Sequence, residues 1–251
     1  MSNYKLLTRG NRDLENGLYH KYSLSYFSFS MFSFTNIIAS INYTNKTNEI
    51  KNNTELIGVD RISFPVNSSL ADETLSGYFR YGKTYSKFKT NFRANVSNSI
   101  FNNIVNNELI KSKRLSHSYT ASVATKFKDA PNFEVGFQKS FSKYSLTGST
   151  TDRPFANFEI GFLKNFILTA DYSYYNYRND EETVKNTYSF LNANLYYQQE
   201  DSKWEFKITA DNLTNNTSIN RDSYNEISDS NATSLYFIQP RYLMFSVKYN
   251  L

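Results

Sequence analysis

The sequence predicts an all-β fold, and more specifically an antiparallel transmembrane β-barrel. Large apolar residues alternate with polar residues in segments that recur along the 251-residue chain, as they do in strands with one face in lipid and one in water. The composition agrees, with 21 Tyr and 21 Phe but only 4 Pro, because aromatic residues favour strands and form the girdles of membrane barrels. Short polar connections also alternate with long ones between these segments.

The final segment shows the alternation most clearly. Leu243, Phe245, Val247, Tyr249 and Leu251 alternate with Met244, Ser246, Lys248 and Asn250. Successive side chains of a strand point to opposite faces. We therefore expect the first set to face lipid and the second set to face a wet interior.

The same pattern predicts the other strands. In the segment 203–213, burial of both faces would desolvate Glu205, Lys207 and Asp211 at a cost of several kcal/mol. Further strands are expected at 17–29, 32–44, within 60–83, and around 88–96, 119–123, 133–138, 155–163, 165–178 and 187–197. The total is about 11 strands, or about 12 if 60–66 and 72–83 are separate strands.

The lengths of the connections orient the predicted barrel. Short connections are expected at 83–86, 128–131, 164–165 and 199–202, and long loops at 101–114, 143–153, 178–186 and 214–235. Barrels of this class have short periplasmic turns and long external loops. Treating 60–83 as a loop arm that leads into a single strand keeps the long connection 44–59 on the external side.

Composition excludes several other classes. The mean hydropathy is −0.59, and no stretch approaches the roughly 18 apolar residues of a spanning helix. There are no cysteines, so disulfides and thiolate metal sites do not occur. The net charge of +5 is scattered without a basic stripe, so we expect no nucleic-acid partner.

Three short segments resemble motifs of one known family. Residues 8–14 (TRGNRDL) resemble the GN-x-x-L segment that precedes a mid-barrel strand, and residues 210–215 (ADNLTN) resemble the NL-x-N segment at the end of the penultimate strand. Residues 239–241 (QPR), followed by the closing segment, resemble the C-terminal end. The family is that of the TonB-dependent outer-membrane receptors, in the form common among Bacteroidetes.

The resemblance implies half of a 22-stranded barrel that in full holds a plug domain. Receptors of this family import siderophores, cobalamin, glycans or peptides with energy delivered by TonB. Residues 1–251 would then be the C-terminal portion of the receptor barrel in the cell outer membrane, with the plug domain absent. Residues 1–8 lack the pattern of an export signal, so we expect a longer parent protein.

The resemblance also implies partners. These are outer-membrane lipid, the rest of the barrel and its plug, and TonB through the missing plug region. The barrel-assembly machinery would engage the closing strand through Leu243, Phe245, Val247, Tyr249 and Leu251. No cofactor and no enzymatic activity are expected.

Two other classes of protein remain open. A complete small outer-membrane barrel, such as a porin or a phospholipase, requires an even strand count and an export signal. Barrel phospholipases place a serine two residues after the histidine, but Tyr119 follows His117 and Tyr22 follows His20 at that spacing, although Ser116 and Ser118 flank His117. A water-soluble β-rich adhesion protein would instead pack its apolar faces on a second sheet.

The candidate site residues fall into two sets. The residues expected to face the interior are Glu159, Asp171, Asn192, Asn194, Glu205, Lys207 and Asp211. On the loops, Arg221 and Tyr224 are the first candidates for ligand contact, because binding residues concentrate on loops. The acidic run 180–182 is expected to be solvated, and Arg241 after Pro240 is expected to be structural.

Overall fold

The structure is a computed structural model that describes residues 5–57, 60–145, 147–225 and 230–250. It confirms the predicted all-β fold, and the described part of the chain contains no helix. No helix long and apolar enough to cross a membrane is therefore present among the described residues. The strands are β1 (Lys5–Thr8), β2 (Leu18–Ser30), β3 (Thr35–Thr47), β4 (Ile50–Ile57), β5 (Asp60–Asn67), β6 (Asp72–Tyr85), β7 (Phe88–Val105), β8 (Glu108–Thr125), β9 (Asn132–Tyr144), β10 (Thr147–Phe162), β11 (Phe166–Asn179), β12 (Lys185–Gln198), β13 (Trp204–Asp211), β14 (Ser218–Asn225), β15 (Ser230–Phe237) and β16 (Tyr242–Tyr249).

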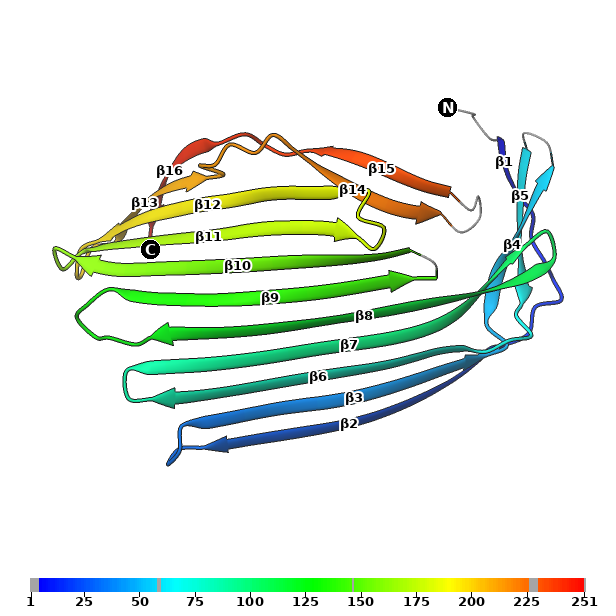
Figure 1. Cartoon of the computed structure of the whole chain (residues 1–251), viewed down its shortest axis with the longest axis horizontal. Helices are drawn as coiled ribbons and strands as arrows, with labels where there is room; N and C mark the ends of the chain where they lie inside the picture. The colour runs from blue at the N-terminus through cyan, green and yellow to red at the C-terminus, as the bar shows by residue number, and fades with distance from the viewer. Residues whose placement is uncertain (1–4, 58–59, 146, 226–229, 251) are drawn as a thin grey trace.

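One large mixed sheet contains fourteen of these strands. Its main path runs β2-β3-β6-β7-β8-β9-β10-β11-β12-β13-β16, which is eleven strands, each antiparallel to its neighbours. The other three strands, β1, β4 and β5, form a side branch at the end of β7 (Figure 1). The pair β14–β15 is a separate hairpin.

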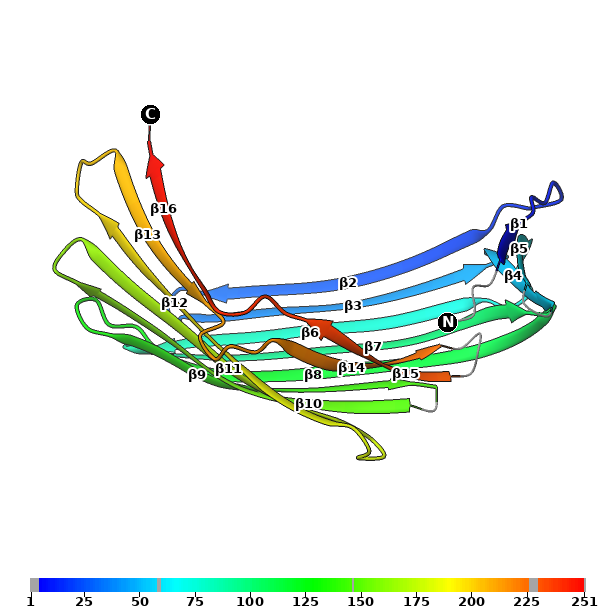
Figure 2. The same ribbon diagram turned by 90° about the horizontal axis from the view of Figure 1, so that it is seen from above.

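The main sheet is open. Figure 2 shows that it curves like a trough, with β2 and β16 on the rising sides and β8 to β10 along the bottom. These two edge strands do not pair with each other in the described part of the chain. The described part of the chain is therefore a curved, open sheet, and no closed barrel is present within it.

The register carries one apolar face across the sheet. Phe162 pairs with Phe166, which pairs with Tyr197, and the row continues through Phe206 to Val247. A second row runs from Ile160 through Leu168, Leu195 and Ile208 to Phe245. Because alternate residues point to opposite faces, this register gathers the alternating polar residues of these five strands on the other face.

Solvent exposure is the reverse of that in a water-soluble protein, since large apolar side chains are exposed and several polar side chains are buried. Leu243 is 74% and Phe245 64% exposed, while Leu251 lies outside the described residues. Conversely, Ser122, Ser173 and Thr209 are buried. The apolar face therefore needs a cover that the described residues do not supply.

Aromatic rings line the apolar face near the short turns. Adjacent rings are close: centroid distances are 5.4 Å for Phe162–Phe166, 4.7 Å for Phe166–Tyr197 and 6.1 Å for Tyr197–Phe206. On the last two strands of the path, Trp204 and Tyr249 are 4.7 Å apart. Cross-strand aromatic pairs of this kind stabilise a sheet.

Two predicted long loops are wrong. The ranges 101–114 and 143–153 lie mostly in strands, because β7 and β8 extend to a two-residue turn, β9 extends to Tyr144 and β10 begins at Thr147. Asn106 and Asn107 form the first turn with φ of 50° and 65°, the left-handed region that Asn tolerates and that tight hairpins require. The predicted loop 214–235 is also partly wrong, because it contains β14 and most of β15.

The ambiguous range 60–83 supplies one strand to the main path. β6 pairs directly with β3 on one side and with β7 on the other, whereas β5 belongs to the side branch. Residues 60–67 and 72–85 thus form two separate strands, so the predicted loop arm over the first part is wrong, although only β6 belongs to the main path. The connection from β3 to β6 leaves the main path and returns to it.

A polar junction fixes the side branch to the sheet. Lys51 donates hydrogen bonds of 2.5 Å to the Asp72 carboxylate and 2.5 Å to the Asn102 carbonyl oxygen. Asn53 is fully buried and bonds Asn107 in the β7–β8 turn through both polar atoms of its side chain. The only apolar residues buried in the described part of the chain, Ile104 and Val105, lie at this junction.

The carboxyl group of Asp72 is held as an anion at the junction, beyond the end of the apolar face. Burial raises its pKa, but the hydrogen bonds from Lys51 and Asn102 and the charge of Lys51 lower it further. The pKa of Asp72 therefore lies below its ordinary value of 3.8. A pKa lowered on folding links the stability of the junction to pH.

Replacing Asp72 with Asn is expected to loosen the side branch by about 1–3 kcal/mol, since a charged hydrogen-bond acceptor is lost and Lys51 stays half-buried. In the native protein this stabilisation is present above the ordinary pKa of the carboxyl and is lost as the pH falls through the lowered folded value. D72N removes that dependence. Protease cleavage within residues 48–71, measured across acidic pH, tests both effects.

The matched control is Glu182→Gln. Glu182 also has a lowered pKa, caused by the hydrogen bond from Lys185 and its charge, but it lies fully exposed in the turn between β11 and β12. E182Q is expected to leave cleavage of the branch unchanged. Equal cleavage of D72N and the native protein at neutral pH would contradict the role assigned to the junction.

Candidate functional site

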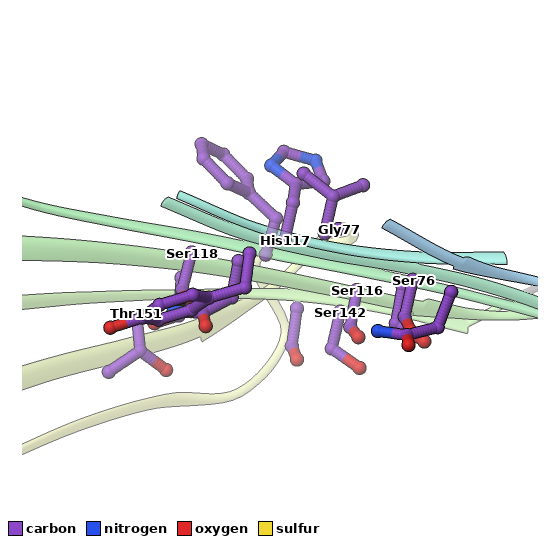
Figure 3. A pocket seen from close by; sticks show the side chains of 15 residues that line it. Ser76, Gly77, Ser116, His117, Ser118, Ser142 and Thr151 are labelled. Carbon is purple, nitrogen blue, oxygen red and sulfur yellow. Dashed lines mark hydrogen bonds between the residues drawn. The ribbon is translucent and has the colours of Figure 1, made fainter. Parts of the chain in front are cut away.

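The polar face of the main sheet holds a shallow hollow of about 430 Å³. It extends across β3, β6, β7, β8, β9 and β10, and hydroxyl and amide side chains line most of it. Figure 3 shows Ser116, Ser118, Ser142 and Thr151 on one side of the strands and His117 on the other. The hollow therefore opens on the face opposite to the apolar one.

Cross-strand pairing orders these side chains into two parallel rows. The first row runs Asn42, Ser76, Ser97, Ser116, Ser142 and Ser149. The second row runs Ser40, Tyr78, Asn95, Ser118, Ser140 and Thr151. Neutral hydroxyl and amide groups make a wet surface for a polar solute, since each presents both donors and acceptors.

A clamped arginine adjoins the second row. Arg153 donates hydrogen bonds from Nε and Nη2 to the Ser173 hydroxyl oxygen, at 3.3 and 3.0 Å, and from Nη1 to Gln138 at 3.3 Å. Its guanidinium carbon lies 5.5 Å from the Phe155 ring centroid and 5.2 Å from that of Tyr175. Such contacts hold the planar group in one orientation.

Aromatic rings extend this arrangement towards β12. Tyr175 and Tyr188 stack with centroids 4.8 Å apart at 14°, and Phe190 meets Tyr188 edge-on at 5.8 Å and 70°. We call Arg153, Phe155, Tyr175, Tyr188 and Phe190 the arginine–aromatic platform. It is the largest ring cluster on the polar face of the described strands.

Gly136 makes room for the platform. A Cβ at this position would lie 2.3 Å from the Phe155 ring and 2.8 Å from the Ala121 carbonyl oxygen. The ring therefore lies directly over the backbone of β9. A side chain at Gly136 must displace Phe155 and disturb Arg153, which contacts the same ring.

The register places all seven predicted interior residues on the polar face. Asp171 faces Asn192, which donates a 2.9 Å hydrogen bond to it, and Asn194 links Thr169 and Thr209. Lys207 lies 5.0 Å from the Tyr196 ring, and Glu205 accepts hydrogen bonds from Lys248 and Asn250.

The last two predicted interior residues also face polar groups. Asp211 accepts a 2.6 Å hydrogen bond from the Tyr242 hydroxyl, and Glu159 faces Thr169. Most of these groups have polar partners on neighbouring strands, which makes them a lining rather than one focused site.

The histidines do not form a serine–histidine pair. His117 lies on the apolar face, where its ring stacks on Phe141 at 4.6 Å and 26°, with Tyr119 at 5.5 Å. Ser116 and Ser118 flank it in sequence but lie on the opposite face (Figure 3). His20 lies on β2, far along the sheet and opposite Asn45.

The predicted acidic run lies in an ordinary solvated turn. The run 180–182 lies in the exposed turn after β11, where Glu182 forms a 2.8 Å ion pair with Lys185. No cluster of three or more metal-ligating side chains occurs among the residues that the structure describes. Arg221 and Tyr224 lie in β14, and their side chains fall outside the described residues.

Two of the segments that carry the family resemblance contact each other. The Asn212 side chain donates a 2.9 Å hydrogen bond to the Gln239 carbonyl oxygen, and the Arg241 backbone N–H donates one of 3.2 Å to Asn215. These bonds tie the end of β13 to the start of β16. Arg241 is thereby placed at a structural contact through its backbone, although its side chain is exposed.

Sequence reasoning missed the arginine–aromatic platform. Arg153 precedes Pro154, within a range predicted as a loop, and the residues that it contacts come from three strands, β9, β10 and β11. Period-two alternation through 147–162 would have placed Arg153 and Phe155 on one face. Their contact with Tyr175 depends on the register between β10 and β11 and was not available from the local pattern.

Comparison with known proteins found no match for the chain among family models, curated proteins or solved structures.

Gly136→Ala is expected to destabilise the sheet by about 1–3 kcal/mol, the usual cost of forcing atoms into filled space. Gly77→Ala is the matched control, since it too lies within a strand but a Cβ there meets nothing within 4 Å. Ala disfavours strands less than Gly, so G77A should be neutral or slightly stabilising. Urea unfolding in detergent gives both free energies, and equal effects would contradict the packing of Phe155 over Gly136.

Proposed function

We propose that this chain is part of the wall of an outer-membrane transporter barrel of the TonB-dependent receptor type. Its apolar face lies against outer-membrane lipid and its polar face lines the interior. The complete receptor takes up an unidentified ligand, a siderophore, a glycan or a peptide, with energy supplied by TonB through a plug. The barrel-assembly machinery inserts it into the membrane.

The observation that carries this proposal is the continuous apolar face, which no other described element covers. On β11 this face runs from Phe166 to Tyr174, roughly 26 Å along the strand at the usual rise. A membrane barrel has an outward apolar band about 25 Å tall with aromatic girdles at its borders. The aromatic row beside the short turns matches one such border.

A water-soluble protein with the same sheet would require a second layer. The apolar face would have to pack on another sheet or helix to remove its large side chains from water. In the described part of the chain no such layer covers this face, since side chains such as Val135 and Phe245 remain exposed, at 59% and 64%. Lipid covers such a face without a protein partner.

Strand direction supports a larger barrel over a complete small one. β2 and β16 are the first and last of eleven strands that alternate in direction, so they run the same way. Direct pairing of these edges would be parallel, whereas outer-membrane barrels of single chains are antiparallel throughout. Antiparallel closure therefore needs an odd number of further strands, and a 22-stranded barrel meets that condition. The small porin or phospholipase alternative does not meet it with these eleven strands.

Fractionation of cells that express the complete native gene product tests the location. The proposal expects the protein in the outer membrane and resistant to extraction by high salt. Recovery of the protein as a soluble periplasmic species would contradict it.

Paired substitutions on β16 test which face meets lipid. Phe245→Arg is expected to lower stability in a bilayer by about 2–4 kcal/mol, because a cation on the lipid face must be desolvated. Met244→Arg, one residue away on the polar face, should change stability little. Both side chains are exposed in the isolated sheet, at 64% and 47%, so equal effects of the two changes would mean that Phe245 does not face lipid. Urea unfolding from lipid vesicles distinguishes the two cases.

A further inference from the structure

Three arginines share one row on the polar face. Arg80 on β6 pairs with Arg93 on β7, which pairs with Thr120. The row continues from Thr120 to Gln138 and then to Arg153 on β10. The whole row lies beside the hydroxyl-lined hollow, two residues along each strand from its second row.

Arg80 and Arg93 stand directly opposite each other. Cross-strand partners have Cβ atoms about 5 Å apart, and like charges there destabilise a sheet. No described carboxylate forms an ion pair with either residue, and no described side chain accepts a hydrogen bond from them. The sheet thus holds two facing cations without a counter-charge.

The third arginine is also without a carboxylate partner among the described residues. Its described acceptors, Ser173 and Gln138, are neutral. A guanidinium has five N–H donors, and the three bonds found leave donors of both Nη atoms for another group. Neutral acceptors orient the cation without cancelling its charge.

The acidic residues of the polar face lie elsewhere. Glu134, on β9, is four residues from Gln138, roughly 13 Å along the strand. Asp171 and Asp211 continue in the row of Glu134, towards the short turns, where Asn157, Asn192 and Tyr242 bond these three carboxylates. The arginine row is therefore a separate positive strip across the middle of the sheet.

We propose that the arginine row binds the anionic group of the ligand, a carboxylate or a phosphate; this rests on the proposed function, since the polar face must be the interior of the barrel. Arg80 and Arg93 bind the oxyanion through paired N–H donors. The spacing of these donors in a guanidinium group matches the oxygen atoms of a carboxylate or a phosphate. The arginine–aromatic platform receives a second part of the same ligand, with Tyr175 and Tyr188 as its apolar contact. The repulsion between the facing arginines destabilises the sheet without ligand, and the bound anion offsets this repulsion by supplying a counter-charge.

Calorimetric titration of the complete protein, purified in detergent, tests the proposal with three probes. Citrate carries carboxylates, glucose 6-phosphate carries a phosphate, and glucose is the neutral match. At least one anionic probe is expected to bind, and glucose is expected to bind about tenfold more weakly or not at all. The anion that binds identifies the anionic group of the ligand as a carboxylate or a phosphate.

The variant R80Q/R93Q removes both facing charges. The bound probe should lose affinity about tenfold or more, since each charged hydrogen bond contributes strongly. The urea midpoint of the same variant should stay the same or rise, because like-charge repulsion is removed. A purely structural role for the arginines would lower that midpoint instead.

The control K128Q/K164Q changes the net charge equally, at exposed turns beyond the ends of the strands, in the β8–β9 and β10–β11 connections. It should leave affinity within about twofold. Absence of binding by both anions, unchanged affinity in R80Q/R93Q, or equal loss in the control would each overturn the proposal. An outer-membrane protein that binds neither anion refutes only this inference, whereas a soluble protein that binds one refutes the proposed function.

Discussion

The structure depends on one constraint, the match between side-chain alternation and cross-strand register. Each strand alone has an apolar and a polar side, but a common face exists only because the pairing keeps those sides in phase from β2 to β16. A slip of one residue in any pair would carry apolar side chains onto the polar face. The aromatic row, the hydroxyl-lined hollow and the arginine row all follow from that register.

The sequence predicted most of the main sheet because its signal is local. Alternation within a strand located all eleven strands of the path and the faces of the seven interior residues. It failed where polar residues continue a strand beyond the apolar face, as in the ends of β7 and β8, because such extensions have the composition of loops. Asn106–Asn107 carried the turn signal that would have corrected this. Contacts between strands, such as Arg153 on Tyr175, have no local signature.

Stability and binding draw on different parts of the polar face. Near the short turns and at the branch, acidic groups are satisfied by amides and lysines, as Asp171 is by Asn192 and Asp72 is by Lys51. In the middle, Arg80 faces Arg93 without a counter-charge from the described residues. Natural proteins tolerate such local cost where a site needs it. The presence or absence of a counter-charge thus distinguishes the lining of the proposed interior from the arginine row that we propose as its binding site.

The proposed function requires that alternate residues of β16 face lipid and water. Because the chain has no cysteines, single cysteines introduced at successive positions from Leu243 to Lys248 can carry a spin label without background. In lipid vesicles, labels at 243, 245 and 247 should collide with oxygen dissolved in the bilayer, and labels at 244, 246 and 248 with a water-soluble relaxation agent. A period of two in that measurement is the result we predict, and equal access of the water-soluble agent to all six positions would contradict it.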